Sequence, residues 1–140
     1  MSVAEVVIGI LLASVHPADL TQQQEIRTAF SALLQDADDG RSRYEQAAFV
    51  VRLPSGHIAL VRWPRSESAD EARWSGPFPS GTVAIAHTHP NWMPRPSRID
   101  AATARSARLP VYVITQSHIT RTDGREVERI ADAGWDRPQA

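Results

Sequence analysis

Hydrophobic residues follow a helical repeat in the first third of the chain. Thr21 is followed three residues later by Gln24, which is typical of a capping box at the start of a helix. The apolar positions that follow recur every three or four residues and predict an amphipathic helix, which the turn-forming residues 36–40 bring to an end. The predicted buried stripe consists of Ile26, Ala29, Phe30, Leu33 and Leu34.

The rest of the chain alternates short apolar runs with turn signals. Residues 47–53 and 57–63 predict the two strands of a hairpin, because Pro54-Ser55-Gly56 between them is a turn sequence. Residues 64–80 are polar and carry no periodic pattern, and long loops of this kind are often functional.

The second half of the chain alternates strands with one helix. The expected elements are a buried strand at 83–86, an alanine-rich helix at 97–109, a buried strand at 111–115, and a hairpin at 119–122 and 125–130. This order of elements predicts an α/β (α+β) fold with a single mixed β-sheet flanked by helices.

The first 18 residues form an apolar extension ahead of a domain that we expect at residues 19–140. The apolar segment 3–15 is too short to span a membrane, which takes roughly 20 apolar residues. Glu5 stands where a signal peptide would carry Lys or Arg, so secretion is disfavoured and a cytoplasmic location is expected. We expect the segment to form an extra packed helix or strand, and we expect no membrane partner.

Composition narrows the classes of chemistry. The formal net charge of the 140 residues is -1, which disfavours a nucleic-acid partner because phosphate contacts require a basic surface. The chain has no cysteine, so thiolate metal ligands and a cysteine nucleophile are excluded. Any metal site must therefore use histidine and carboxylate side chains. Oligomeric state is left open by the sequence.

Residues 81–100 carry the strongest chemical signal. The predicted buried strand leads into His87 and His89, and residues two apart in a strand point to the same face. Pro90 ends the strand. Ser97 and Asp100 then have the spacing of a capping box at the start of the next helix.

These side chains match the ligand set of a catalytic zinc site. Two imidazoles and one carboxylate leave a position for water, and zinc makes water acidic enough to act near neutral pH. Such a site also needs a general base and a donor to the carbonyl oxygen, and Ser97 is suited to the donor role. In the alternative interpretation, Ser97 and Asp100 only cap the helix and the histidines are structural.

One motif resembles the signature of the JAMM metalloproteases, also called JAB or MPN domain proteins. It consists of His87-Thr88-His89-Pro90, then six residues, Ser97, two further residues and Asp100. The resemblance implies a cytidine deaminase-like fold and one Zn²⁺ per chain held by His87, His89 and Asp100. It further implies that Ser97 supports the tetrahedral intermediate and that an early glutamate takes the proton of the water.

Glu45 is the acid that fits the place of this glutamate, after the first helix and at the start of a strand. The family glutamate is often followed by a glycine-containing segment, whereas Gln46-Ala47-Ala48 follows it here. The alternative for Glu45 is a surface acid paired with Arg41 or Arg43.

The resemblance implies a zinc-dependent isopeptidase or peptidase of the compact bacterial type. Its expected substrate is a ubiquitin-like protein or its conjugate, from which the enzyme would remove or process the modifier. Two alternatives stay open: a catalytically inactive protein-binding module on the same fold, and a zinc hydrolase of a small amide.

Overall fold

The computed structural model describes residues 19–65 and 72–137. The predictions for residues 1–18 lie outside this part of the chain. Among the described residues, no helix combines the length and the apolar character needed to cross a membrane.

The described chain forms one six-stranded mixed sheet in the order β2-β1-β3-β4-β5-β6. Only the central pair β3–β4 is parallel, and every other neighbouring pair is antiparallel. The predicted α+β fold with a single mixed sheet is thereby confirmed. The strands are β1 (Ala47–Arg52), β2 (Ile58–Arg62), β3 (Thr82–Thr88), β4 (Val111–Ile114), β5 (Ile119–Thr122) and β6 (Val127–Ala131).

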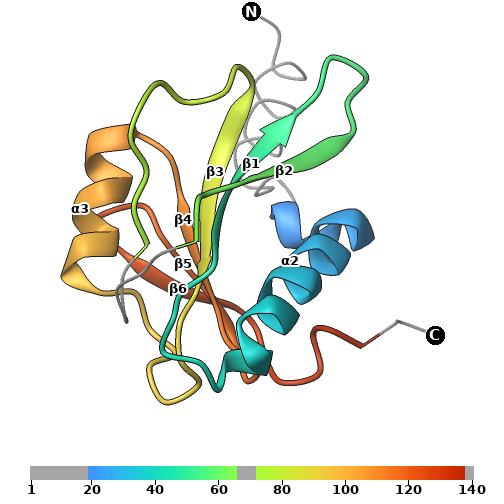
Figure 1. Ribbon diagram of the computed structural model, residues 1–140, viewed down its shortest axis with the longest axis vertical. Coiled ribbons are helices and arrows are strands. Elements are labelled where there is room, and N and C mark those ends of the chain that lie inside the picture. Colours follow the sequence, from blue (N-terminus) through green and yellow to red (C-terminus); the bar gives the residue numbers. More distant parts are fainter. Residues whose placement is uncertain (1–18, 66–71, 138–140) are drawn as a thin grey trace, which may run out of the picture.

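Two α-helices cover opposite faces of this sheet (Figure 1). Helix α2 (Gln24–Asp36) buries the predicted stripe, with Ile26, Phe30 and Leu33 fully enclosed, against Ala84 and Ala86 of β3. Helix α3 (Arg98–Ala107) connects β3 to β4 and packs on the other face. Two short 3₁₀ helices, η1 (Leu20–Gln22) and η2 (Asp38–Gly40), flank α2.

The predicted start of the first helix was wrong. Thr21 lies in η1, and the residue at the N-cap of α2 is Gln23, which makes no side-chain cap hydrogen bond. Asp19 engages Thr21 instead. Its carboxylate accepts hydrogen bonds from both the backbone N–H and the hydroxyl of Thr21, at 2.9 and 2.5 Å. A carboxylate acceptor makes stronger hydrogen bonds than a neutral hydroxyl, so the chain turns two residues earlier than the capping-box pattern indicates.

The alternation of β3 decides which helix faces the histidines. Ala84 and Ala86 lie under α2. Side chains alternate along a strand, so Ile85, His87 and His89 point toward α3. Ile85 packs with Ala104 of α3, as this alternation requires. His87 and His89 therefore emerge on the α3 face, at the end of β3 from which the chain continues into that helix.

Residues 72–80 of the polar segment are anchored to the same face by aromatic side chains. Trp74 and Phe78 contact Phe49 of β1, with ring centroids 4.9 and 4.7 Å apart. Trp63, at the end of β2, also packs on Phe49 at 5.3 Å. This cluster holds residues of the segment beside the end of β3 that carries the histidines.

Candidate metal centre

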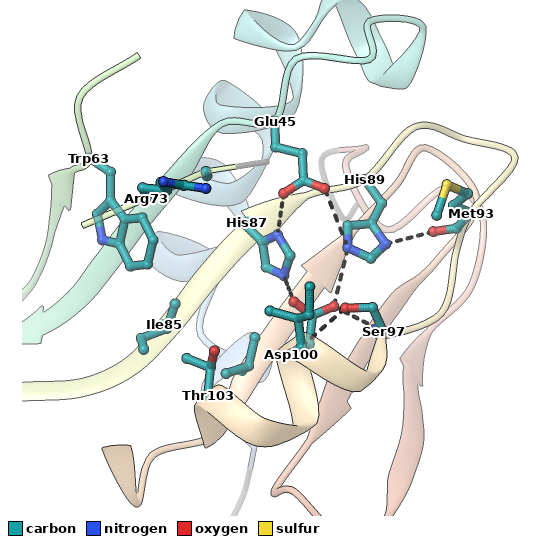
Figure 2. Close-up of a pocket in the computed structure, with 13 residues that line it drawn as sticks. Glu45, Trp63, Arg73, Ile85, His87, His89, Met93, Ser97, Asp100 and Thr103 are labelled. Atoms are coloured by element: carbon teal, nitrogen blue, oxygen red, sulfur yellow. Dashed lines mark hydrogen bonds and ion pairs between the residues drawn. The ribbon is translucent and has the colours of Figure 1, made fainter. Parts of the chain in front are cut away.

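Asp100 joins the two histidines at the start of α3. Its Oδ1 lies 2.8 Å from Nε2 of His87, and its Oδ2 lies 3.2 Å from Nε2 of His89 (Figure 2). All three side chains are at most 9% exposed. The strand end, the loop 89–97 and the first turn of the helix thus bring one carboxylate against both imidazoles.

Glu45 approaches the same histidines from the opposite side. Its Oε2 lies 3.1 Å from Nδ1 of His87 and its Oε1 lies 3.8 Å from Nε2 of His89. Figure 2 shows Glu45 and Asp100 on the two sides of the histidine pair. Arg41, one of the two arginines considered as a partner of Glu45, forms ion pairs with Asp38 and Asp39.

The sheet register explains the position of Glu45. Ala47 of β1 is paired with His87 of β3. The pairing continues one residue further, because Thr88 donates its backbone N–H to the carbonyl of Gln46 at 2.8 Å and accepts from the N–H of Gln46 through Oγ1 at 2.9 Å. Glu45 is the next residue along, on the same face as Ala47, and so its side chain is directed at the histidine pair.

The donor atoms are arranged as a metal site would require. One ligand atom each from Glu45, His87 and His89 lie within 4.8 Å of one another, so these residues could hold a metal ion. His87 Nε2 is buried and, within the described residues, makes no hydrogen bond of good geometry, although Asp100 Oδ1 lies 2.8 Å away. Such an orphaned nitrogen among carboxylates fits a metal ligand.

The orientation of His89 is fixed by a backbone carbonyl. Its Nδ1 lies 2.9 Å from the carbonyl oxygen of Met93, in the loop that follows Pro90. An Nδ1–H that donates to this oxygen leaves the lone pair on Nε2, which faces Asp100. Metal-binding histidines are commonly held in this way by a carbonyl or carboxylate on the other ring nitrogen.

The histidines and the carboxylates of the centre shift one another's pKa values. Burial lowers the pKa of His87, but the carboxylates of Asp100 and Glu45 outweigh burial and raise the pKa to about 10. Burial raises the pKa of Asp100, but the two imidazoles and the N–H of Ser97 outweigh it and hold this pKa well below its usual range. Without a metal, a proton on His87 is therefore the cation between the two carboxylates.

Ser97 forms the capping box that its spacing predicts. Its Oγ accepts the N–H of Asp100 at 3.1 Å, and Asp100 Oδ2 accepts the N–H of Ser97 at 2.7 Å. The cap fixes the carboxylate that faces the histidines. Because Oγ acts only as an acceptor in the cap, the hydroxyl proton of Ser97 remains available for a further acceptor.

Three supporting residues escaped the sequence interpretation: Thr88, Met93 and Asn91. Asn91 donates through Nδ2 to the carbonyl of Asp39 at 2.8 Å and accepts the N–H of Gln116 at 2.9 Å, which ties the loop after His89 to two distant turns. The polar side chains of Thr88, between the histidines, and of Asn91, two residues after His89, are signals that could have indicated these two residues. Met93 acts through its backbone carbonyl, so its side-chain type carries no such signal.

The centre lies at one end of a pocket of about 330 Å³. Residues far apart in the sequence meet in it, including Ala72 and Arg73 from the long polar segment. The remaining lining residues are Glu45, Trp63, Ile85, His87, His89, Met93, Ser97, Ile99, Asp100, Thr103 and Val111.

Comparison with known families decides the classification. The family model of prokaryotic homologs of the JAB domain matches residues 13–130. The chain belongs to this family. Neither a curated protein nor a solved structure matches this JAB-domain homolog. Family membership and the candidate metal site together support a JAMM-like hydrolase or a related module.

Proposed function

We propose that this JAB-domain homolog is a zinc-dependent isopeptidase or peptidase that removes or processes a ubiquitin-like modifier in a bacterium. The observation that carries the proposal is the placement of Asp100 and Glu45 on opposite sides of one histidine pair, inside a pocket. Hydrolysis of an amide at a metal needs ligands for the metal and a proton acceptor for the water, and two carboxylates in different positions can fill one role each.

His87, His89 and Asp100 are the proposed zinc ligands. Imidazole nitrogens and a carboxylate oxygen suit zinc, and three protein ligands leave room for water or substrate. The Nε2 atoms of both histidines face Asp100, which is why this carboxylate rather than Glu45 is assigned the ligand role. When bound, zinc supplies a Lewis acid that polarises the carbonyl group and makes water acidic near neutral pH.

Glu45 is the proposed general base. Its carboxylate is about one-tenth exposed and lies 3.1 Å from His87 Nδ1, at the pocket wall opposite Asp100. There it can take a proton from the attacking water on one of its oxygens and deliver that proton to the leaving amine nitrogen. Glu45 lies two residues before β1 and not in the strand, loop or helix of the ligands, so its loss need not disturb them.

Ser97 is the proposed donor to the carbonyl oxygen of the substrate. Ser97 and Asp100 both line the pocket. Its Oγ is held by the N–H of Asp100, so the hydroxyl proton can be directed into the pocket as negative charge develops on the substrate oxygen.

The proposal is tested with the zinc-loaded protein and three substrates: a ubiquitin-like protein with a C-terminal peptide extension, the same protein joined to a lysine side chain, and a small acetylated amide. Cleavage of either protein substrate that is lost on chelation and restored by zinc is the expected result. Cleavage of the small amide alone would favour the small-amide hydrolase instead. Stoichiometric zinc with no cleavage of any substrate, but with binding of the ubiquitin-like protein, would favour the inactive binding module.

A further inference from the structure

The pocket has an apolar end that the proposed chemistry does not use. Figure 2 shows Trp63, Ile85 and Thr103 on one side of His87, together with the charged side chain of Arg73, whereas His89, Met93 and Ser97 lie on the other. The volume of about 330 Å³ is at the lower end of small-molecule pockets, which span about 300–1,000 Å³. A pocket of this size extends beyond the space that a metal and one amide group occupy.

The floor of the apolar end is built into the sheet. Ile85 of β3 and Val111 of β4 are direct neighbours in the parallel pair and are 2% and 1% exposed. Side chains this deeply buried sit in fixed rotamers, so the shape of the floor is preformed.

The walls come from β2 and α3. Trp63 is braced by Phe49 at a ring-centroid distance of 5.3 Å. Ile99 and Thr103 are four residues apart on α3 and so share one face of that helix, and Ile99 is 78% exposed although it lines the pocket. An exposed isoleucine at a pocket mouth offers apolar surface that a bound side chain would cover.

We propose that this apolar end is a subsite for an aromatic or branched aliphatic side chain of the residue next to the amide that is cleaved. The assignment of that amide rests on the proposed function. The subsite adjoins the metal centre directly, because Ile85 precedes His87 by two residues on the same face of β3 and Ile99 precedes Asp100. A lysine side chain would lose hydration against these walls and would bring a second positive charge near Arg73, and glycine would leave the walls uncovered.

Binding is tested without any need for cleavage. The protein, with and without zinc, is labelled at the isoleucine δ1-methyl groups and titrated with N-acetyl-leucinamide, N-acetyl-phenylalaninamide and N-acetyl-glycinamide in NMR experiments. The leucine and phenylalanine compounds should shift the methyls of Ile85 and Ile99 saturably. Ile26 and Ile114, which pack in the cluster under α2, are internal controls and should not move. Equal shifts with the glycine compound, or equal shifts at the control methyls, would overturn the subsite.

Selectivity is tested with two peptide sets, acetyl-Ala-X-Gly-Ala-amide and acetyl-Ala-Gly-X-Ala-amide, in which X is Gly, Leu, Phe or Lys. The subsite serves one side of the cleaved amide, so one of the two sets should show the preference. In that set, kcat/KM for X = Leu or Phe should exceed kcat/KM for X = Gly or Lys by about 10- to 100-fold, the range that filling an apolar pocket gives. Thr103→Phe fills the subsite and should bring the Leu-to-Gly ratio close to one. Ser106→Phe, an exposed position on the same helix outside this pocket, is the matched control and should keep the ratio.

The two accounts fail in different ways. Saturable shifts of Ile85 and Ile99 without cleavage of any substrate would support the subsite and count against the proposed hydrolase. Cleavage with no preference for Leu or Phe in either set would support the hydrolase and overturn the subsite. If Thr103→Phe does not fold, the wild-type peptide sets and the NMR titration decide the question by themselves.

Discussion

Thr88 holds Gln46 by two hydrogen bonds, one to its carbonyl oxygen and one from its N–H. Thr88 lies between the two histidines in sequence, and Gln46 follows Glu45. The pair therefore couples the backbone that carries the proposed ligands to the backbone that carries the proposed base, across the boundary between β3 and β1.

Thr88→Val tests this coupling because valine keeps the shape and the strand preference of threonine but removes the oxygen. The N–H of Gln46 would lose its acceptor, at a cost of about 1–3 kcal/mol in unfolding free energy. We expect bound zinc to stay at the wild-type level while kcat falls about 10- to 100-fold, since Glu45 is misplaced. Thr88→Ser retains the hydroxyl and is the control. Wild-type kcat in Thr88→Val would show that this contact does not position the base.

Ser97→Ala separates the two roles of the capping serine. Loss of the cap should lower the unfolding free energy by about 1 kcal/mol, measured by denaturant unfolding. If the hydroxyl also donates to the substrate oxygen, kcat should fall about 10²- to 10³-fold with zinc content unchanged. Ser97→Thr, which keeps both the cap and the hydroxyl, is the matched control. Reduced stability with unchanged kcat would leave only the structural role.

Gly40 and Asn91 form a close contact that supports the loop after His89. Gly40 has a φ of +83°, and a Cβ there would lie 2.0 Å from Asn91 Oδ1. Gly40→Ala should cost more than the roughly 1–2 kcal/mol of a left-handed alanine and should lower zinc occupancy by displacing Asn91. Gly56→Ala is the control, because Gly56 has a φ of +88° with no atom within 4 Å of its Cβ position. Equal stability losses and full zinc occupancy in both variants would contradict this role for Asn91.

The pKa of His87 predicts how zinc binding and stability depend on pH. Its folded value of about 10 exceeds the ordinary 6.5, so its contribution to the stability of the metal-free protein is complete below about pH 6.5 and is lost as pH rises toward 10. Zinc must displace that proton. The apparent zinc affinity should therefore rise about tenfold per pH unit between pH 6.5 and 9, with proton release measurable by calorimetry in buffers of different ionisation enthalpy. A pH-independent affinity would contradict the protonated state of His87.

Sequence alone predicts the local parts of the site well. The period of two in a strand places His87 and His89 on one face, and the capping box that Ser97 and Asp100 form follows from a spacing of three. Both features depend on residues within one or two elements. Whether these residues bind zinc remains a prediction.

What sequence cannot predict here depends on pairing between distant strands. The position of Glu45 is fixed by the register of β1 on β3, and the apolar end of the pocket combines Trp63 of the β2 end with Val111 of β4. The tail after residue 130 has little pattern, yet Trp135 is buried and donates its indole N–H to the carbonyl of Thr115 at 3.0 Å. The error at Thr21 has a local cause instead, because the carboxylate of Asp19, two residues earlier, holds both the backbone N–H and the hydroxyl of Thr21.

The central claim is that Asp100 is a ligand and Glu45 is the base, although both carboxylates contact the histidines. His87→Ala and His89→Ala should each abolish stoichiometric zinc binding and so serve as reference variants for an emptied site. They leave the division between the two carboxylates open, because both lose the same metal.

The deciding measurement is zinc per chain together with the rate of amide cleavage in Glu45→Gln and Asp100→Asn, compared side by side. Both changes preserve shape and remove one negative charge. We predict that Glu45→Gln keeps one zinc per chain and loses about 10²- to 10⁴-fold in kcat, the usual range for a general base, whereas Asp100→Asn loses the metal and the activity together. Loss of zinc in Glu45→Gln with retention in Asp100→Asn would contradict the account and make Glu45 the ligand.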